Sequence, residues 1–228
     1  MFGLDDRIAT FSDGKTILVV VAVSMLLGLR HASDPDHLAA VTTLIASSRE
    51  RAGRRAAKLG LTWGLGHATS LFVFGLPVVL YSAYLPKPVQ SAAETSVGLL
   101  IICLAVLLLA RWRRGVFVVG HTHTHVPTRS TRGAFGIGLV HGMGGTAGVG
   151  LLLLAAIRSH ALAVTALGLF AICTAVSMAL LSTGFGLTLG AAGVRRSFQR
   201  IAPALGIVSL AFGVWYALGA QGMVPYMF

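Results

Sequence analysis

The sequence predicts an all-α integral membrane protein, and three features of its composition carry that prediction. Hydrophobic residues make up 55% of the 228 residues, and the mean hydropathy is +0.82. Charged residues make up only 11%, whereas a soluble domain carries about 25%. The apolar residues also fall into runs of the roughly 20 residues that a helix needs to cross a bilayer. We therefore expect helices whose outer faces contact lipid.

The apolar runs predict about six transmembrane helices, at about 17–45, 60–84, 93–110, 134–157, 162–190 and 203–221. The first run is long and contains Pro35. A proline ring clashes with the carbonyl four residues earlier, here that of His31, so we expect a kink or a break between these two residues. Glu94 falls at the expected start of the third helix, where a carboxylate suits the positive end of the helix dipole.

Basic residues predict the orientation of these helices. The first, third and fifth loops hold five, five and three Lys or Arg residues, whereas four lie on the opposite side. Cytoplasmic loops are enriched in Lys and Arg. We therefore expect these three loops in the cytoplasm, both termini outside, and a multi-pass protein of the cell inner membrane. The net charge of +11 comes from basic residues in short loops between apolar runs. This is the pattern of a membrane protein, so we expect the lipid bilayer as a partner and no nucleic acid.

The two halves of the chain resemble each other, which predicts one transporter domain (residues 1–228) containing two inverted three-helix repeats. The segment 28–31, Gly-Leu-Arg-His, is matched 110 residues later by the segment 138–141, Gly-Leu-Val-His. His67 falls opposite Ser177 at the same offset. Secondary transporters built in this way bind their substrate between the repeats. The expected halves and the cytoplasmic loop that joins them are about 1–112, 130–228 and 111–133.

The strongest candidate for chemistry is the segment 30–37, Arg-His-Ala-Ser-Asp-Pro-Asp-His. It holds two of the seven acidic residues of the chain, and ionisable groups inside a membrane mark an ion or substrate path. On a straight helix, Asp36 would point away from the face shared by His31, Asp34 and His37, but a break at the proline would bring it round. Imidazoles beside carboxylates favour a divalent transition metal. The expected ligands are His31, Asp34, Asp36 and His37.

His67 is expected to complete this metal site from the second helix. It is the only ionisable residue between Lys58 and Lys87, and it would face the first helix if the two helices pair. The alternative is a structural histidine that bonds to a neighbouring helix. Thr69 and Ser70 are either accessory oxygen ligands or bond back to their own helix.

The fourth expected helix and the loop before it supply further candidates. His141, Met143 and Thr146 would line the ion path, because neighbouring glycines permit the helix to unwind; tight helix packing around one hydrogen-bonded histidine is the alternative. The loop holds alternating histidines, a pattern typical either of loose metal binding or of a flexible loop with chance histidines. The loop residues expected to contact metal on the cytoplasmic side are His121, His123 and His125.

These motifs resemble those of the nickel/cobalt transporter family (NiCoT), in particular its short six-span members. His31, Asp36 and His37 match the family's His-x4-Asp-His motif, and the segment 66–70 is similar to its Gly-His-Ser/Thr signature. The chain has fewer spans than the longer members, and its glycine-rich segment 144–148 lacks their acidic residue. The resemblance implies secondary transport of nickel(II) or cobalt(II) across a bacterial inner membrane, with the ion as substrate and no prosthetic group.

We therefore expect a permease rather than an enzyme, with metal uptake as the favoured direction. The sequence contains no His-Glu-x-x-His, Gly-x-Ser-x-Gly or P-loop motif, so the corresponding metalloprotease, hydrolase and nucleotide-hydrolysing chemistries are not expected. Three alternatives stay open: metal efflux, export of a small anion along a path that uses Arg30, and an intramembrane metal-dependent hydrolase. The oligomeric state is also open, a homo-oligomer included.

Overall fold

The computed structural model describes residues 4–46, 52–81, 86–115, 130–144, 157 and 159–225. Every regular element in these ranges is a helix, which confirms the all-α prediction. The elements are α1 (Leu4–His31), α2 (Pro35–Ala46), α3 (Ala52–Tyr81), α4 (Lys87–Arg113), α5 (Thr131–His141), α7 (His160–Gly190) and α8 (Ala192–Ala220).

The long helices are those of a multi-pass membrane protein. Within the described ranges, α3, α4, α7 and most of α8 are long and apolar enough to cross a bilayer, and α1 with α2 adds a fifth candidate if the pair counts as one broken span. The helices α2 and α5 have 12 and 11 residues, or about 18 Å and 17 Å, against a hydrocarbon core of about 30 Å. The expected span at 134–157 overlaps α5 and otherwise lies mostly outside the described residues.

The first expected helix is broken where the proline predicts it. The helix α1 ends at His31, α2 begins at Pro35, and their axes are bent by 52°. Two backbone hydrogen bonds close the turn between them, from Ser33 N–H to the Arg30 carbonyl (2.8 Å) and from Asp34 N–H to the His31 carbonyl (3.1 Å). Pro35 starts α2 without cost, because the first residue of a helix has no intrahelical partner for its N–H group.

The expected start of the third span was wrong, since α4 begins at Lys87 instead of near residue 93. Lys87, Gln90 and Ser91 are polar, so hydropathy alone missed this end, while a proline in the first turn favours it. Glu94 therefore lies two turns inside the helix, 4% exposed, and accepts a hydrogen bond from Gln90 Nε2 (3.0 Å).

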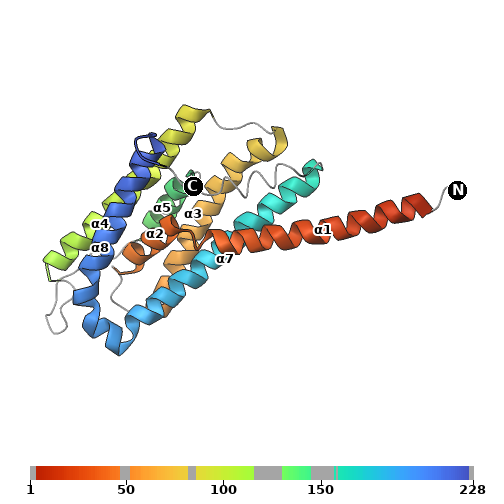
Figure 1. Cartoon of the computed structure of the whole chain (residues 1–228). Helices are drawn as coiled ribbons and strands as arrows, with labels where there is room; N and C mark the ends of the chain where they lie inside the picture. Colours follow the sequence, from red (N-terminus) through yellow and green to blue (C-terminus); the bar gives the residue numbers. More distant parts are fainter. Residues whose placement is uncertain are drawn as a thin grey trace.

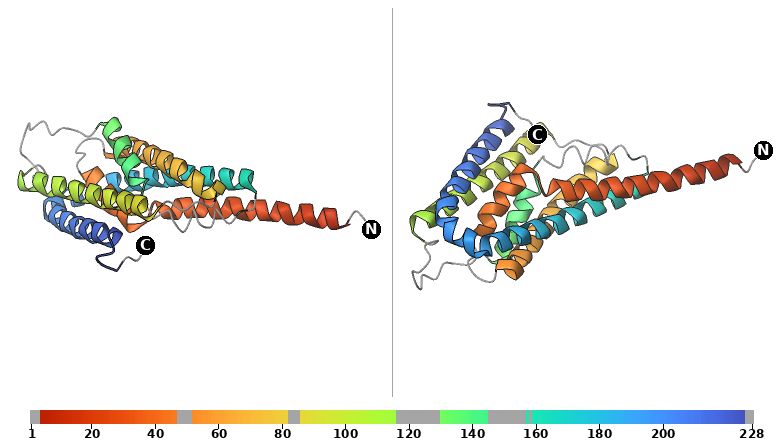
Figure 2. Two further views of the ribbon diagram at one scale, coloured as in Figure 1. Left: turned by 90° about the horizontal axis from the view of Figure 1, so that it is seen from above. Right: turned by 60° about the horizontal axis from the view of Figure 1, so that its bottom comes forward.

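The long helices pack as interlocking pairs. The helix α3 packs along α7, α4 packs along α8, α1 lies against α7, and α5 lies against α3 (Figures 1 and 2). Glycines make two of these contacts close, because Gly64 of α3 meets the backbone of Ala175 in α7, and Gly138 of α5 meets the carbonyl of Trp63 in α3. Small residues at such crossings are typical of helix packing in lipid.

The two short helices lie inside this arrangement and bring their ends together. The helix α2 contacts α4, α7 and α8, and α5 contacts α3 and α4. Figure 1 shows both between α3 and the α4–α8 pair. Short broken helices at membrane depth are tolerated where protein surrounds them or where they line a cavity. The first turn of α2 and the last residues of α1 and α5 therefore meet in the interior.

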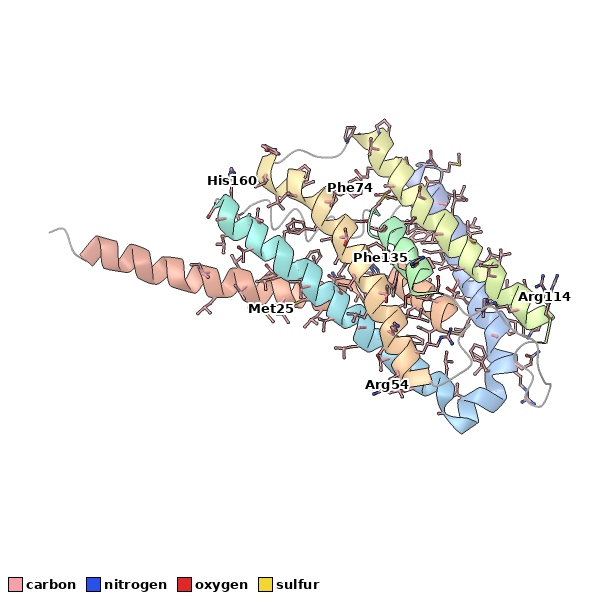
Figure 3. All side chains as sticks on the ribbon, turned by 180° about the vertical axis from the view of Figure 1, so that it is seen from behind. Met25, Arg54, Phe74, Arg114, Phe135 and His160 are labelled. Carbon is pink, nitrogen blue, oxygen red and sulfur yellow. The ribbon has the colours of Figure 1, made fainter. Side chains whose placement is uncertain are left out.

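Basic residues gather toward one end of the bundle. Figure 3 shows Arg54 at the start of α3 and Arg114 after α4 toward the same end, with Phe74 and His160 toward the other. At the basic end, Trp112 Nε1 of α4 donates to the Gln199 carbonyl of α8 (2.8 Å). This arrangement is the one on which the expected orientation in the membrane depends.

Candidate metal centre

Four imidazoles and a carboxylate are buried together where α1, α2, α3 and α5 meet. None of the five side chains belongs to a residue that is more than 4% exposed. One is the last residue of α1, two lie in the first turn of α2, one is in the middle of α3, and one is the last residue of α5. They are His31, Asp36, His37, His67 and His141.

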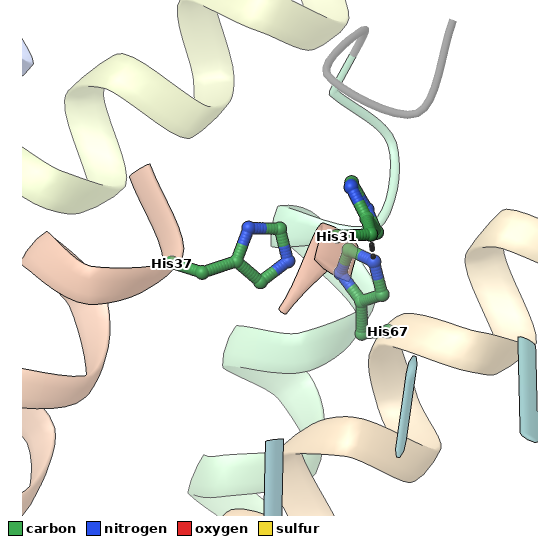
Figure 4. Close-up of side chains that lie close together, drawn as sticks. All are labelled: His31, His37 and His67. Carbon is green, nitrogen blue, oxygen red and sulfur yellow. Dashed lines mark hydrogen bonds between the residues drawn. The ribbon is translucent and has the colours of Figure 1, made fainter. Parts of the chain in front are cut away.

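Three of the imidazoles form a first group, which we call the imidazole cluster: His31, His37 and His67. Each offers a ligand atom, and these atoms all lie within 4.8 Å of one another. His31 Nε2 and His67 Nε2 are 3.2 Å apart, and the His37 ring lies 4.6 Å from the His31 ring and 4.8 Å from the His67 ring, centroid to centroid (Figure 4). Side chains from three different helices therefore converge on one small volume.

A second group, the carboxylate cluster, consists of Asp36, His37 and His141. Its ligand atoms also lie within 4.8 Å of one another. The two oxygens of Asp36 point to different histidines, Oδ1 to His37 Nδ1 (3.1 Å) and Oδ2 to His141 Nε2 (3.1 Å). His37 belongs to both groups.

The spacing of these atoms suits a transition-metal ion. Metal–nitrogen bonds of about 2.0–2.1 Å at roughly right angles place neighbouring ligand atoms about 3 Å apart. The contacts of 3.1 Å and 3.2 Å in the two clusters match that separation. Imidazole suits nickel, copper and zinc, and one carboxylate offsets part of the charge of a divalent cation. The donor set therefore fits a divalent transition-metal ion.

Several buried nitrogens at this centre have no hydrogen-bond partner in the part of the chain that the structure describes. His37 Nε2, His67 Nδ1 and His141 Nδ1 are buried and make no hydrogen bond among the described residues. Leaving a buried polar atom unpaired costs about 1–3 kcal/mol. Three unpaired buried nitrogens in one place call for an explanation, and a site that binds a ligand is one.

Asp34 contacts this centre from outside. Its Oδ2 lies 2.9 Å from His31 Nδ1, and its side chain is 16% exposed. With Nδ1–H donating to the carboxylate, the lone pair of His31 is on Nε2, the nitrogen that faces His67. Carboxylates orient metal-binding histidines in this way. The break at Pro35 thus places the two acids differently from a straight helix. Asp36 lies in the carboxylate cluster, and Asp34 lies beside the imidazole cluster.

The hydroxyls of α3 bond to backbone carbonyls. Thr69 is exposed and donates to the Leu65 carbonyl of its own helix (2.8 Å). Ser70 Oγ donates to the Leu139 carbonyl of α5 (2.7 Å), which ties the two helices together beside the centre.

Of the remaining residues expected to contact the ion, the structure describes only Met143. Met143 is half-buried two residues after α5 ends. Thr146 and the loop histidines lie outside the described residues; the latter are His121, His123 and His125.

Trp63 also lies at the centre, although no role was predicted for it from the sequence. It is 1% exposed, and its ring lies 5.9 Å from that of His37 and 5.7 Å from that of His141. It comes one helical turn before His67 on α3. An aromatic at that spacing is ordinary in a packed helix, so nothing but the fold identifies it as a wall of the site.

Arg30 lies away from this centre although it precedes His31. Its side chain is exposed. The two clusters contain one carboxylate, that of Asp36, and four imidazoles. This charge suits a cation and disfavours an anion.

Comparison with known proteins shows which family this chain resembles in sequence. Residues 17–128 match the NicO family, described as high-affinity nickel-transport protein. The matched segment includes four of the five side chains of the centre. The urease accessory protein UreH of Bacillus sp. (strain TB-90) is 27% identical over 216 residues, which cover 90% of this chain and 92% of that protein.

Two named transport proteins are similar over shorter stretches. The high-affinity nickel transport protein of Cupriavidus necator is 28% identical over 103 residues, or 45% of this chain and 29% of that protein. The cobalt transport protein NhlF of Rhodococcus rhodochrous is 33% identical over 90 residues, or 39% of this chain and 25% of that protein. No solved structure matches this chain.

Proposed function

This chain belongs to the NicO family of nickel-transport proteins, and we propose that it carries nickel(II) or cobalt(II) across the bacterial inner membrane as a secondary transporter. The family is one of transporters, which confirms that the chain is not an enzyme and removes the hydrolase alternative. The observation that carries the proposal is the buried centre on the broken helix, where two groups of three His or Asp side chains hold ligand atoms within 4.8 Å of one another.

The cation passes through the two clusters as a dehydrated ion. His31, Asp36, His37, His67 and His141 replace its water ligands. Asp34 holds His31 in the binding tautomer, as the contact of 2.9 Å supports. A mixed nitrogen and oxygen site binds nickel well enough to strip its water yet weakly enough to release it, which conduction requires.

Uptake is the proposed direction. An inside-negative membrane potential favours inward movement by about 2.3 kcal/mol per charge per 100 mV. A divalent cation thus gains about twice that energy on entry without any coupled ion. The proposed orientation places the basic end of the bundle in the cytoplasm and both termini outside. The histidines of loop 111–133 then contact metal at the inner mouth.

The proposed halves, 1–112 and 130–228, act as inverted repeats. An offset of 110 residues relates α1 to α5, α3 to α7 and α4 to α8. Under that relation, the contact of α1 with α7 corresponds to the contact of α5 with α3, and both occur. The centre lies at the junction of the two halves, where inverted-repeat transporters bind their substrate.

Metal content of intact cells tests this function. Cells that express the chain, cells that express His37→Ala and cells with an empty vector are supplied with radiolabelled nickel, and the label retained is counted. His160→Ala is the matched control, because His160 is exposed at the start of α7. We expect accumulation above the vector for the chain and for the control, and loss of it for His37→Ala.

Two other outcomes are informative. Label below the vector level that His37→Ala restores would reverse the direction to efflux through the same centre. Equal label in all four strains, with each protein detected in the membrane, would remove nickel as the substrate, and the same assay with cobalt would then decide whether the proposal stands.

A further inference from the structure

His37 lies between the two clusters and presents one nitrogen to each. Its Nδ1 is 3.1 Å from Asp36 Oδ1 in the carboxylate cluster. Its Nε2 is buried without a hydrogen-bond partner among the described residues, and Figure 4 shows that side of the ring directed toward His31 and His67. The two nitrogens of an imidazole point in different directions, and in the neutral ring only one of them has a free lone pair. His37 can therefore serve one cluster at a time, according to which nitrogen holds the proton, without moving its backbone.

The surroundings of His37 are nearly symmetric. The ring of His31 lies 4.6 Å away at an interplanar angle of 67°, and the ring of His141 lies 4.5 Å away at 66°. His31 and His141 are the matching positions of the two Gly-Leu-x-His segments, 110 residues apart. Each cluster therefore contains one member of this pair, together with the same His37.

The described residues form two groups of three at ligand spacing, and the rings of His67 and His141 are 5.8 Å apart. This arrangement does not favour a single ion position that all five side chains share equally. Two ions at once are also disfavoured, because two divalent charges a few ångströms apart in a low-dielectric interior repel each other strongly.

We propose that the transported cation occupies two adjacent positions in turn, the imidazole cluster and the carboxylate cluster, and passes between them by exchanging Nε2 of His37 for Nδ1 while the ring proton moves the opposite way, from Nδ1 to Nε2. This inference rests on the proposed function and specifies how the ion moves through its centre. Each position supplies three protein ligands, and His37 is common to both. The ion therefore does not have to regain its water between the two positions, which lowers the barrier to passage.

The two positions differ in charge, and this difference makes them distinguishable. The imidazole cluster offers nitrogen ligands alone, whereas the carboxylate cluster offers an oxygen as well. His67→Ala removes a ligand from the first and leaves the second complete, and His141→Ala does the reverse. Cobalt(II) reports the change, because its visible absorption depends on the number and kind of its ligands.

The experiment measures equilibrium binding of cobalt(II) and its visible spectrum for the purified full chain in detergent, beside transport of cobalt into proteoliposomes. The variants are His67→Ala, His141→Ala, the two combined, and His160→Ala as control. We expect each single variant to bind one ion, with spectra that differ from each other, and to lose at least about tenfold in transport, the lower end of what metal-site changes cost in activity. The combined variant binds no ion.

Three results would overturn the relay: loss of all binding in either single variant, identical spectra in both, or unimpaired transport in either. Glutamine in place of alanine at the same positions separates misfolding from loss of a ligand, since a variant that elutes as the intact protein and fails to bind has lost the site. If the unaltered chain neither binds nor moves cobalt or nickel, the proposed function itself fails. If it does both and a single variant loses all binding, only the relay fails.

Discussion

His31 and His141 end their helices in the same backbone turn. After His31, the carbonyls of residues 30 and 31 accept from the N–H groups of residues 33 and 34, at 2.8 Å and 3.1 Å. After His141, the carbonyls of residues 140 and 141 accept from residues 143 and 144, at 3.3 Å and 3.2 Å. Two helix C-termini therefore meet at the centre, and each carries the partial negative charge of a helix dipole.

These two helix ends explain why the centre suits a cation. The start of α2 contributes the opposite partial charge, but Asp36 in its first turn offsets that charge. The carboxylate and the two C-termini then leave an excess of negative potential around the imidazoles. An anion path would need a buried positive group here, and Arg30 is exposed instead.

Arg30→Ala is therefore predicted to leave metal transport within about twofold of the unaltered chain, a change below 1 kcal/mol in the barrier. The measurement is radiolabelled nickel uptake at equal protein in the membrane. Arg30→Lys, which keeps a basic group at this position, is compared with Arg30→Ala. An anion exporter would lose its activity in the alanine variant and keep part of it in the lysine variant, so that pattern would contradict the cation path.

Asp34→Asn is predicted to weaken metal binding by about 10–100-fold without removing the site, because the carboxylate orients His31 instead of binding the ion. The asparagine keeps the size of the side chain and loses the charge-assisted hydrogen bond to His31 Nδ1. Titration of purified protein with cobalt(II) measures the affinity, and the visible spectrum at saturation reports the ligands. A changed spectrum at saturation would mean that Asp34 is itself a ligand.

The sequence predicted the break that forms the site and named both acids as ligands, but it could not predict which histidine each acid would contact. Helical periodicity places Asp34 with His31 and His37 only if the helix continues, and Pro35 restarts it at a new angle. The position of Asp36 between His37 and His141, with Asp34 beside His31, depends on the bend of 52°, an angle that residue spacing does not give. The pairing of Asp36 with His141 joins residues 105 apart, and it depends on how α5 packs against α3.

Ser70→Ala is predicted to lower stability by about 0.5–1.5 kcal/mol, the net worth of an ordinary hydrogen bond, and to reduce metal affinity little. Its hydroxyl donates to the Leu139 carbonyl and so joins α3 to α5. Thr69→Val is the matched control, since Thr69 is exposed and bonds within its own helix. Heating in detergent, followed by measurement of the protein that stays in solution, gives the stability. If Ser70→Ala loses most of its affinity for cobalt while its stability is unchanged, the hydroxyl is a ligand.

Gly138→Ala is predicted to disrupt the centre although residue 138 binds nothing. A Cβ atom at this position would overlap the Trp63 carbonyl and lie 2.8 Å from the His67 backbone nitrogen. Both are backbone atoms of α3, which cannot move aside as a flexible side chain would, so α5 must shift away. Such overpacking costs about 1–3 kcal/mol. The shift also carries His141 away from Asp36 Oδ2, now 3.1 Å distant.

Gly136→Ala is the control for this prediction, because it adds the same methyl group to the same helix two residues earlier. A Cβ atom there would meet nothing within 4 Å, and alanine is more favourable than glycine inside a helix by about 0.5–1 kcal/mol. We expect Gly136→Ala to match or exceed the stability of the unaltered chain and to keep its nickel uptake, and Gly138→Ala to lose both. Equal behaviour of the two variants would mean that the close contact of α5 with α3 does not hold His141 in the centre.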